Sequence, residues 1–162
     1  MSPRAWLWRG NVEDYADPIP HRRPLAAVWQ LTPTDCHDDC MIGRLHHVIL
    51  DCPDPAALAA FYAELLGQPI TYSSDDFVVV AADERSSGLA FQLAPGHQRP
   101  TWPDPSVPQQ LHLDVMVEDV AAAGPRVLAL GATTLDGEDV YADPAGHPFC
   151  LIRRPWWAPP IE

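Results

Sequence analysis

Hydrophobic and polar positions follow a regular order from residue 45 onward. A short apolar run at 45–50 predicts a strand. Asp54 and Pro55 then predict a helix start, because Asp caps an N-terminus and Pro fits the first helical position. Apolar residues recur at helical spacing up to Gly67, the expected helix end. Further strands are predicted at 68–72, 77–81 and 89–93, so this part of the chain is expected to be β-α-β-β-β.

The same order of elements returns after a connector, residues 95–108, that holds five prolines and is expected to be stiff. The second copy is predicted to have a helix that begins after Asp119 and stops at Gly131. Pro125 falls inside this helix, where it removes a backbone donor and is expected to kink or restart the helix. Strands of the second copy are predicted at 110–117, 133–135, 140–142 and 149–153.

Paired positions indicate that the two copies form an internal repeat. His47 lies seven residues before Asp54, and His112 lies seven residues before Asp119. We therefore predict an α+β fold of two pseudo-symmetric βαβββ modules. The expected divisions of the chain are an arm at 1–40, modules at 41–94 and 109–155, the connector at 95–108 and a tail at 156–162.

Residues 1–40 differ from the rest, because they are rich in proline and sustain no helical or strand period. We expect an irregular arm with a short strand at 26–31. Met41 is an alternative start, so it stays open whether the arm belongs to the native protein. Cys36, His37 and Cys40 lie close together, but a structural zinc site needs four ligands, and a solvated acidic loop is the preferred interpretation.

Composition and charge exclude several functions. All ten cations are Arg and none is Lys, which excludes Schiff-base chemistry and a P-loop lysine. The formal charge of −12 argues against nucleic acid or an anionic membrane as partner. No apolar run has the length of a membrane span, and four cysteines are too few for a disulfide scaffold in 162 residues. We expect a reduced, cytoplasmic protein.

Three segments together resemble a known superfamily. The two strands that open the modules, at 45–51 (LHHVILD) and 110–115 (QLHLDV), and the turn at 143–147 (DPAGH) resemble those of vicinal oxygen chelate proteins. That superfamily includes glyoxalase I, extradiol dioxygenases and bleomycin-resistance proteins, and the chain is most similar to its small glyoxalase-like domains. The resemblance implies that the two modules form a half-barrel cleft.

The resemblance also implies a metal-ligand set that points into the cleft: His47, Gln92, His112 and Cys150. His47 is preferred to His46 because the repeat pairs it with His112, and strand alternation sends His46 to the opposite face. Zinc is the expected divalent ion, because a thiolate is a soft ligand. The alternative is a metal-free pocket, with hydrogen-bonded histidines and a buried Cys150.

Four further residues are weaker candidates for ligand binding: Tyr62, His97, Trp102 and His147. Trp102 could cover the mouth of the cleft as an aromatic lid, or simply pack the connector against the surface. The helical spacing of Tyr62 instead suggests a core residue.

Two functions therefore stay open. The first is a metal-dependent lyase or isomerase acting on a small molecule, with the metal as Lewis acid. It is not expected to be a true glyoxalase I, because Cys150 stands where the metal-dependent relatives carry Glu. The second is a metal-free protein that sequesters a small molecule, as bleomycin-resistance proteins do, with a charge that suits a cationic or neutral ligand. A homodimer is compatible with both.

Overall fold

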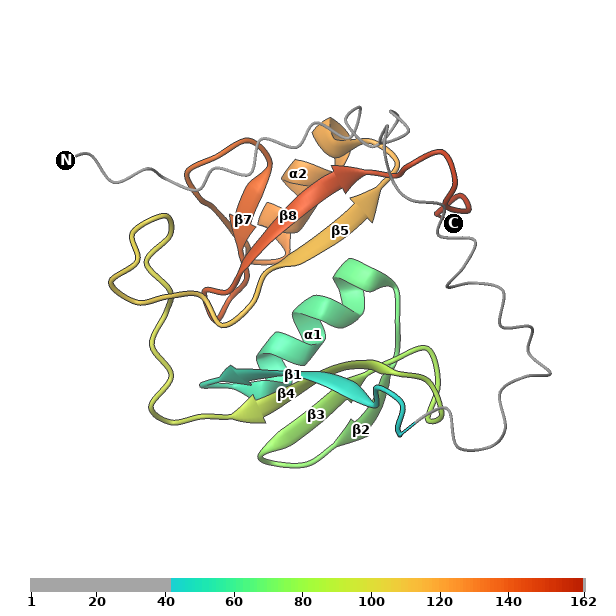
Figure 1. Cartoon of the computed structure of the whole chain (residues 1–162), viewed down its shortest axis with the longest axis vertical. Helices are drawn as coiled ribbons and strands as arrows, with labels where there is room; N and C mark the ends of the chain where they lie inside the picture. The colour runs from blue at the N-terminus through green and yellow to red at the C-terminus, as the bar shows by residue number, and fades with distance from the viewer. Residues whose placement is uncertain (1–41, 162) are drawn as a thin grey trace. The chain divides into compact units, whose positions relative to one another are not determined.

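The computed structural model describes residues 42–161. The first module consists of β1 (His47–Cys52), α1 (Pro55–Leu66), β2 (Ile70–Ser73), β3 (Phe77–Val80) and β4 (Gly88–Leu93) (Figure 1). The second consists of β5 (Leu113–Val117), α2 (Val120–Ala129), β6 (Thr133–Thr134), β7 (Val140–Ala142) and β8 (Pro148–Arg153). The predicted order β-α-β-β-β is confirmed in both copies. The expected strand at 26–31, the cysteines at 36 and 40 and the start at Met41 lie outside the described residues.

Local sequence signals fix the two ends of α1. The Asp54 carboxylate accepts a hydrogen bond from the Ala57 amide at 3.0 Å, which satisfies one of the free N–H groups of the first turn. Pro55 occupies the first helical position, as predicted. Gly67 ends the helix in the left-handed conformation (φ 62°), which costs glycine nothing because it has no Cβ.

The second helix repeats the N-terminal cap and accommodates a proline. Asp119 accepts from the Ala122 amide at 3.1 Å. The helix does not restart at Pro125, because α2 is one element from Val120 to Ala129. The carbonyl that loses its helical partner belongs to Ala121, which is exposed, so water can take the place of the missing donor.

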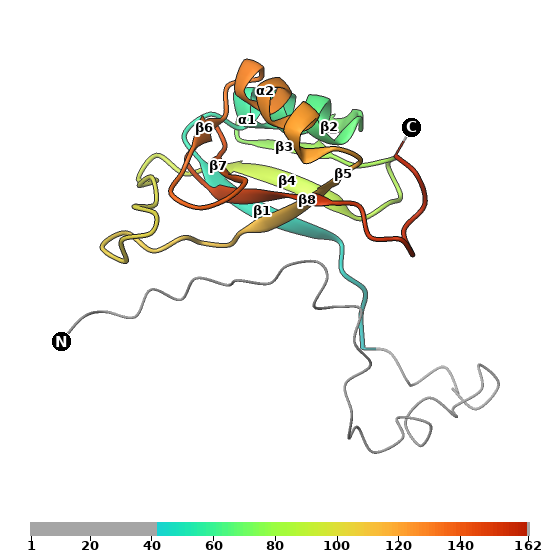
Figure 2. The ribbon, with the colours of Figure 1, turned by 90° about the horizontal axis from the view of Figure 1, so that it is seen from above.

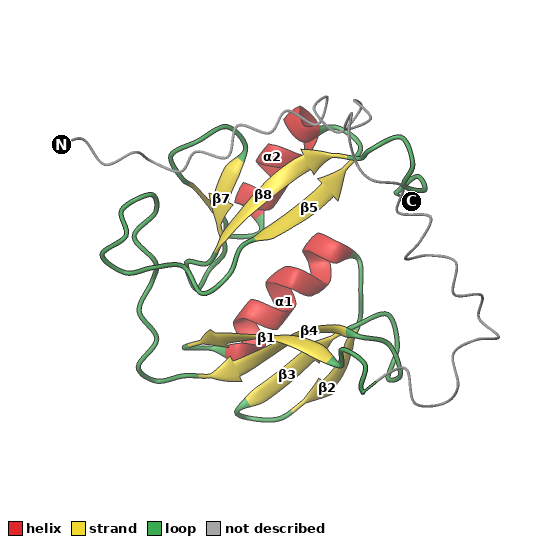
Figure 3. Cartoon of the chain, in the orientation of Figure 1, coloured by secondary structure: helices red, strands yellow, loops and turns green. Residues whose placement is uncertain are grey.

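Each module forms its own four-stranded sheet, and the strands of both sheets are coloured yellow in Figure 3. The strand orders are β1-β4-β3-β2 and β5-β8-β7-β6, so the two sheets have the same topology. In each sheet the first strand runs parallel to the last, and the other neighbours are antiparallel. Neither described sheet closes into a barrel.

Both helices lie on the same side of the sheets (Figure 2). Alternate residues of β1 (Val48, Leu50 and Cys52) and of β5 (Leu113, Val115 and Val117) pack toward the helices in one core shared by the two modules. Because strand residues alternate between faces, the intervening residues lie on the side away from the helices, here called the open face. Candidate site residues on the open face are therefore free to meet a ligand.

Candidate metal centre

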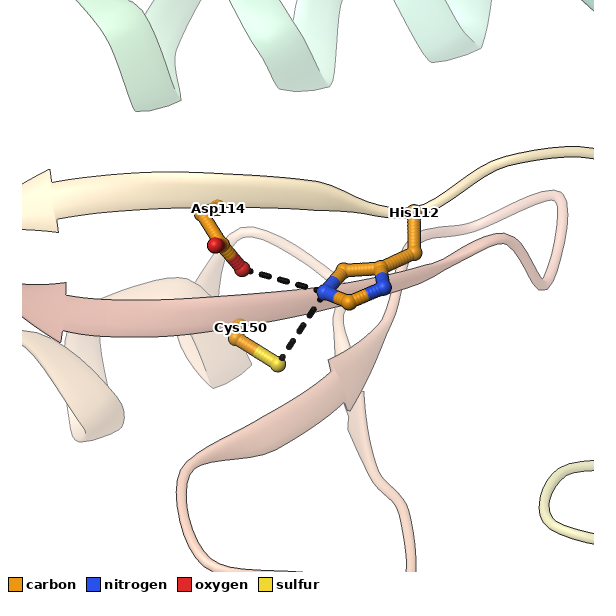
Figure 4. A group of neighbouring side chains, drawn as sticks. All are labelled: His112, Asp114 and Cys150. Atoms are coloured by element: carbon orange, nitrogen blue, oxygen red, sulfur yellow. Dashed lines mark hydrogen bonds and ion pairs between the residues drawn. The ribbon is translucent and has the colours of Figure 1, made fainter. Parts of the chain in front are cut away.

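Three ligand-type side chains converge on the open face of the second sheet (Figure 4). Asp114 lies on β5, and His112, two residues earlier, shares its face. Cys150 lies on β8 directly opposite Asp114 in the strand register. Nε2 of His112 is 3.0 Å from Oδ1 of Asp114 and 3.7 Å from Sγ of Cys150. All three ligand atoms lie within 4.8 Å of one another.

The two distances from Nε2 of His112 are close to the edges of a tetrahedral metal site. With zinc bonds near 2.0 Å to N and O and 2.3 Å to S, tetrahedral angles put an N and an O ligand about 3.3 Å apart and an N and an S ligand about 3.5 Å apart. The observed separations differ from these by a few tenths of an ångström. An imidazole, a carboxylate and a thiolate are all zinc ligands, and three protein ligands leave a fourth position for water or substrate, as in catalytic sites.

The electrostatic surroundings of the cluster are acidic. Burial raises the pKa of the Cys150 thiol, and the nearby carboxylates of Asp114 and Asp139 raise it further. Burial and Glu138 likewise raise the pKa of Asp139. A divalent cation would neutralise this negative charge. Once bound, it would also favour the thiolate of Cys150 over the thiol. The side chains of His112 and Asp114 are 35% and 48% exposed, so the cluster is open to solvent.

His47 and Gln92 occupy the first sheet and do not meet each other. His47 pairs with Gly88, and its Nδ1 accepts from the Gly88 amide at 3.2 Å. Gln92 pairs with Asp51, four residues further along β1, which corresponds to about 13 Å along the strand. Burial, and to a lesser degree His46, lowers the pKa of His47. His47 is not one of the three residues of the described ligand group.

A difference in strand register explains why the two modules are not equivalent here. In the second sheet Cys150 pairs with Asp114, so His112 is offset from it by only two residues. Gly88 and Gly146 lie four residues before Gln92 and Cys150, but Gly88 is in a strand and Gly146 is in a turn. The glycine therefore has the same sequence spacing to Gln92 and to Cys150. The strand pairing differs: Gln92 pairs four residues after His47, whereas Cys150 pairs two residues after His112.

Two of the four candidate ligand-binding residues share a buried carboxylate. The Tyr62 hydroxyl donates to Oδ2 of Asp143 at 2.9 Å, and Nδ1 of His147 lies 2.9 Å from the same oxygen. All three side chains are fully buried. Burial, followed by the charge of Asp143 and its hydrogen bond, raises the pKa of Tyr62 far above its usual range. Tyr62 is therefore held as a neutral hydrogen-bond donor.

The other two candidates lie on the connector. Nε2 of His97 is 2.9 Å from the Ala145 carbonyl oxygen, and its ring centroid is 5.1 Å from that of His147. Trp102 donates from Nε1 to the Asp136 carbonyl oxygen at 2.7 Å and is half-buried. Both contacts tie the connector to the second module.

Asp114 is the member of the cluster that the sequence analysis missed. The signal was available, because a His-x-Asp pattern in a strand puts both side chains on one face. The resemblance directed attention to one position in each strand, and His112 already filled that position in this strand.

Each of the two βαβββ modules carries polar residues on the open face of its first and last strands. This arrangement is that of the vicinal oxygen chelate superfamily. The family model that describes the glyoxalase-like domain matches residues 47–152 of this chain. The chain belongs to this family, which confirms the resemblance inferred from the sequence.

Solved structures show the same fold. One is a glyoxalase/bleomycin resistance/dioxygenase family enzyme from Burkholderia phytofirmans (18% identity, TM-score 0.52), with 68% of this chain and 98% of that chain covered. Another is a glyoxalase-related enzyme from Fulvimarina pelagi (19% identity, TM-score 0.51), with 72% and 92% covered. No curated protein sequence matches the chain. Among the described residues, no helix combines the length and apolar character that crossing a bilayer requires.

Proposed function

We propose that this protein binds one divalent metal ion, preferably zinc, through His112, Asp114 and Cys150, and acts on a small oxygen-bearing molecule as a lyase or isomerase. The observation that carries the proposal is the convergence of three different ligand atoms within 4.8 Å. The nitrogen and sulfur donors favour zinc over calcium or magnesium, which prefer oxygen ligands and higher coordination numbers.

A bound zinc ion would supply Lewis-acid polarisation of a substrate carbonyl or hydroxyl. The roles of the chain's own residues follow from their positions. His112 and Asp114 present their ligand atoms from one strand face, and Cys150 presents its sulfur from the neighbouring strand. Met116, the next open-face residue of β5, is 41% exposed and offers apolar contact to a substrate beside the metal.

The substrate is expected to be neutral or cationic. The formal charge of the chain is −12, and Asp139 lies close enough to Cys150 to affect its pKa. A strongly anionic substrate would be repelled by this field. Cys150 in place of the glutamate of metal-dependent relatives argues against true glyoxalase I activity.

Elemental analysis of the purified full chain tests the proposal. We expect about one zinc per chain after metal-supplemented expression, and zinc loss in His112→Ala. Asp114→Asn tests whether Asp114 is one of the ligands, because the zinc affinity of this variant should then fall at least roughly tenfold. Cys52→Ala is the matched control, since Cys52 is a described free cysteine that lies in the core. Absence of stoichiometric metal, or equal zinc in all variants, would overturn the assignment.

The second candidate is a metal-free protein that sequesters a small molecule. Exposed apolar side chains on the open faces favour it, because Ile49 and Tyr72 are 47% and 56% exposed and would cover an apolar ligand. This function would be preferred if the protein from metal-supplemented expression holds no metal and still binds a hydrophobic cation in equilibrium dialysis. Antibiotic resistance would be one use of such binding.

We also propose that the protein forms a homodimer, which is compatible with either function. Trp156 and Trp157 are 89% and 67% exposed, and a second copy could bury them together with the apolar part of the open faces. Sedimentation equilibrium tests this assembly, and Trp156→Ser should shift the distribution toward monomer. A cytoplasmic location stays a prediction from the sequence.

A further inference from the structure

A cavity of about 320 Å³ lies where the end of β1, the connector and the segment before β5 meet. The polar lining residues that are not fully buried are Asp51, His97, Gln98 and Gln110. The rest of the lining is mostly apolar and consists of Ala94, Pro95, Gly96, Pro100 and Pro108, with the fully buried His147 behind them. None of the three residues of the candidate metal centre lines this cavity.

Two hydrogen bonds hold the side chain of Gln110 in one orientation. Its Oε1 accepts from the backbone amide of Asp51 at 3.3 Å, and its Nε2 donates to Oδ2 of Asp51 at 2.9 Å. A Gln110 amide turned by 180° would place donor against donor and acceptor against acceptor, so this network assigns its oxygen and nitrogen. The amide is therefore preorganised, although Gln110 is exposed.

This pair leaves one donor and one acceptor free in the same wall of the cavity. The Nε2 group of Gln110 carries a second N–H, because an amide nitrogen has two hydrogens and only one is used. Within residues 42–161, Oδ1 of Asp51 forms no hydrogen bond. The two free groups flank a single hydrogen bond and lie close together. They are complementary to a ligand group that accepts and donates at one atom.

A hydroxyl group meets this requirement, since its oxygen both donates and accepts. An ammonium group donates only and a carboxylate accepts only, so each would leave one member of the pair without a partner. Asp51 would also repel a carboxylate, and no arginine lines the cavity to offset that repulsion. The wall thus selects a neutral hydroxyl compound.

The other walls favour a ligand with several hydroxyls over water, which also donates and accepts. Within the described residues the side chain of Gln98 forms no hydrogen bond, so its amide can turn to donate to or accept from a second hydroxyl. Nε2 of His97 faces the Ala145 carbonyl oxygen at 2.9 Å and donates to it, which leaves Nδ1 of the neutral ring as an acceptor. The proline rings offer apolar surface to the C–H groups of a ligand.

We propose that this cavity binds a neutral polyhydroxy molecule, one hydroxyl of which bridges Nε2 of Gln110 and Oδ1 of Asp51 while another contacts Gln98. The volume suits a single small ring, because it falls at the lower end of the range for small-molecule pockets. The proposal does not rest on metal binding.

The test titrates the ¹⁵N-labelled full chain, in EDTA and at constant ionic strength, with probes that share one ring and differ in the polar group. They are vicinal cis-cyclohexanediol, its dimethyl ether, cyclohexylammonium and cyclohexanecarboxylate. The side-chain amide signals of Gln110 report on its free N–H, and the backbone amide of Gly96 reports on the cavity in every variant. The diol should shift both signals saturably. The other three probes should bind at least roughly tenfold more weakly, because each leaves a donor or an acceptor of the pair unsatisfied.

Two variants test the pair itself. Gln110→Met keeps the length of the side chain but removes the N–H donor, and should weaken diol binding roughly tenfold. Gln109→Met is the matched control, because Gln109 is exposed and does not line the cavity. In Asp51→Asn the remaining oxygen accepts from Gln110 and an amide donor replaces the free acceptor, so the diol should lose affinity while cyclohexanecarboxylate gains it.

Three results would each overturn the proposal. The first is the absence of a saturable shift with the diol, and the second is binding of the ammonium or the carboxylate as tight as that of the diol. The third is equal diol binding by Gln110→Met and Gln109→Met. None of these results changes the zinc content of the protein, so this proposal and the proposed function are judged separately.

Discussion

The hydroxyl of Tyr62 on α1 donates to Oδ2 of Asp143, 81 residues further along the chain, at 2.9 Å. Both side chains are fully buried. The acceptor is also the residue whose other oxygen holds the turn before β8 through three backbone amides. One hydrogen bond thus joins the helix of the first module to the turn that begins the last strand of the second.

Replacement of Tyr62 by Phe is expected to lower the free energy of unfolding by about 1–3 kcal/mol, because Oδ2 of Asp143 loses one of its two buried donors. Urea denaturation followed by circular dichroism measures the change. Tyr72→Phe is the matched control, since this tyrosine is 56% exposed and should change stability by less than about 0.5 kcal/mol. Equal effects of the two variants would contradict the role assigned to the buried pair.

Stability is expected to fall at alkaline pH through Cys52. Burial is the main cause that raises the pKa of the Cys52 thiol to about 11, and the carboxylates of Asp143, Asp54 and Asp51 add to it. Because the pKa is higher in the folded state, the contribution is fully present below the ordinary value of 9.0 and is lost as the pH rises through the folded value. Two pKa units correspond to roughly 2–3 kcal/mol.

Comparison with Cys52→Ala isolates that contribution from other titrating groups. Urea midpoints of wild type and variant should be compared at pH 8 and pH 10.5. The wild type should lose its stability advantage over the variant at the higher pH. A constant difference between the two proteins would show that Cys52 does not titrate as inferred.

Loss of the Asp54 cap is expected to destabilise the protein by about 1 kcal/mol, because the Ala57 amide then lacks its partner in the first turn of α1. Asp54→Ala should show this loss in thermal or urea unfolding, while Asp54→Ser should recover most of it. Asp75→Ala removes the same charge outside any helix and serves as control. A Ser variant no better than Ala would mean that charge, rather than the cap, is responsible.

Zinc is expected to protect Cys150 from alkylation. Iodoacetamide should label Cys150, which is partly exposed, and leave the buried Cys52 largely unmodified in the folded protein. Peptide mass spectrometry assigns the label to each cysteine. Zinc should slow labelling of Cys150 in the wild type and have little effect in His112→Ala. Unchanged labelling in the presence of zinc would remove the thiol from the proposed ligand set.

The sequence by itself determined the helices, the order of elements and the family. Asp54 and Asp119 are local signals that act within one helical turn, so their effect can be predicted without tertiary information. The repeat follows from the same local patterns. It also directed attention to His112 and Cys150, which the fold brings within 3.7 Å.

Tertiary structure decided which side chains meet. Strand register depends on pairing between distant segments, so the equal spacing before Gln92 and Cys150 did not reveal that only Cys150 lies near its module's histidine. The register also brought Asp114 into the cluster. The contact of Tyr62 and His147 with one buried carboxylate required two modules to pack together, because no local pattern relates residues 81 positions apart.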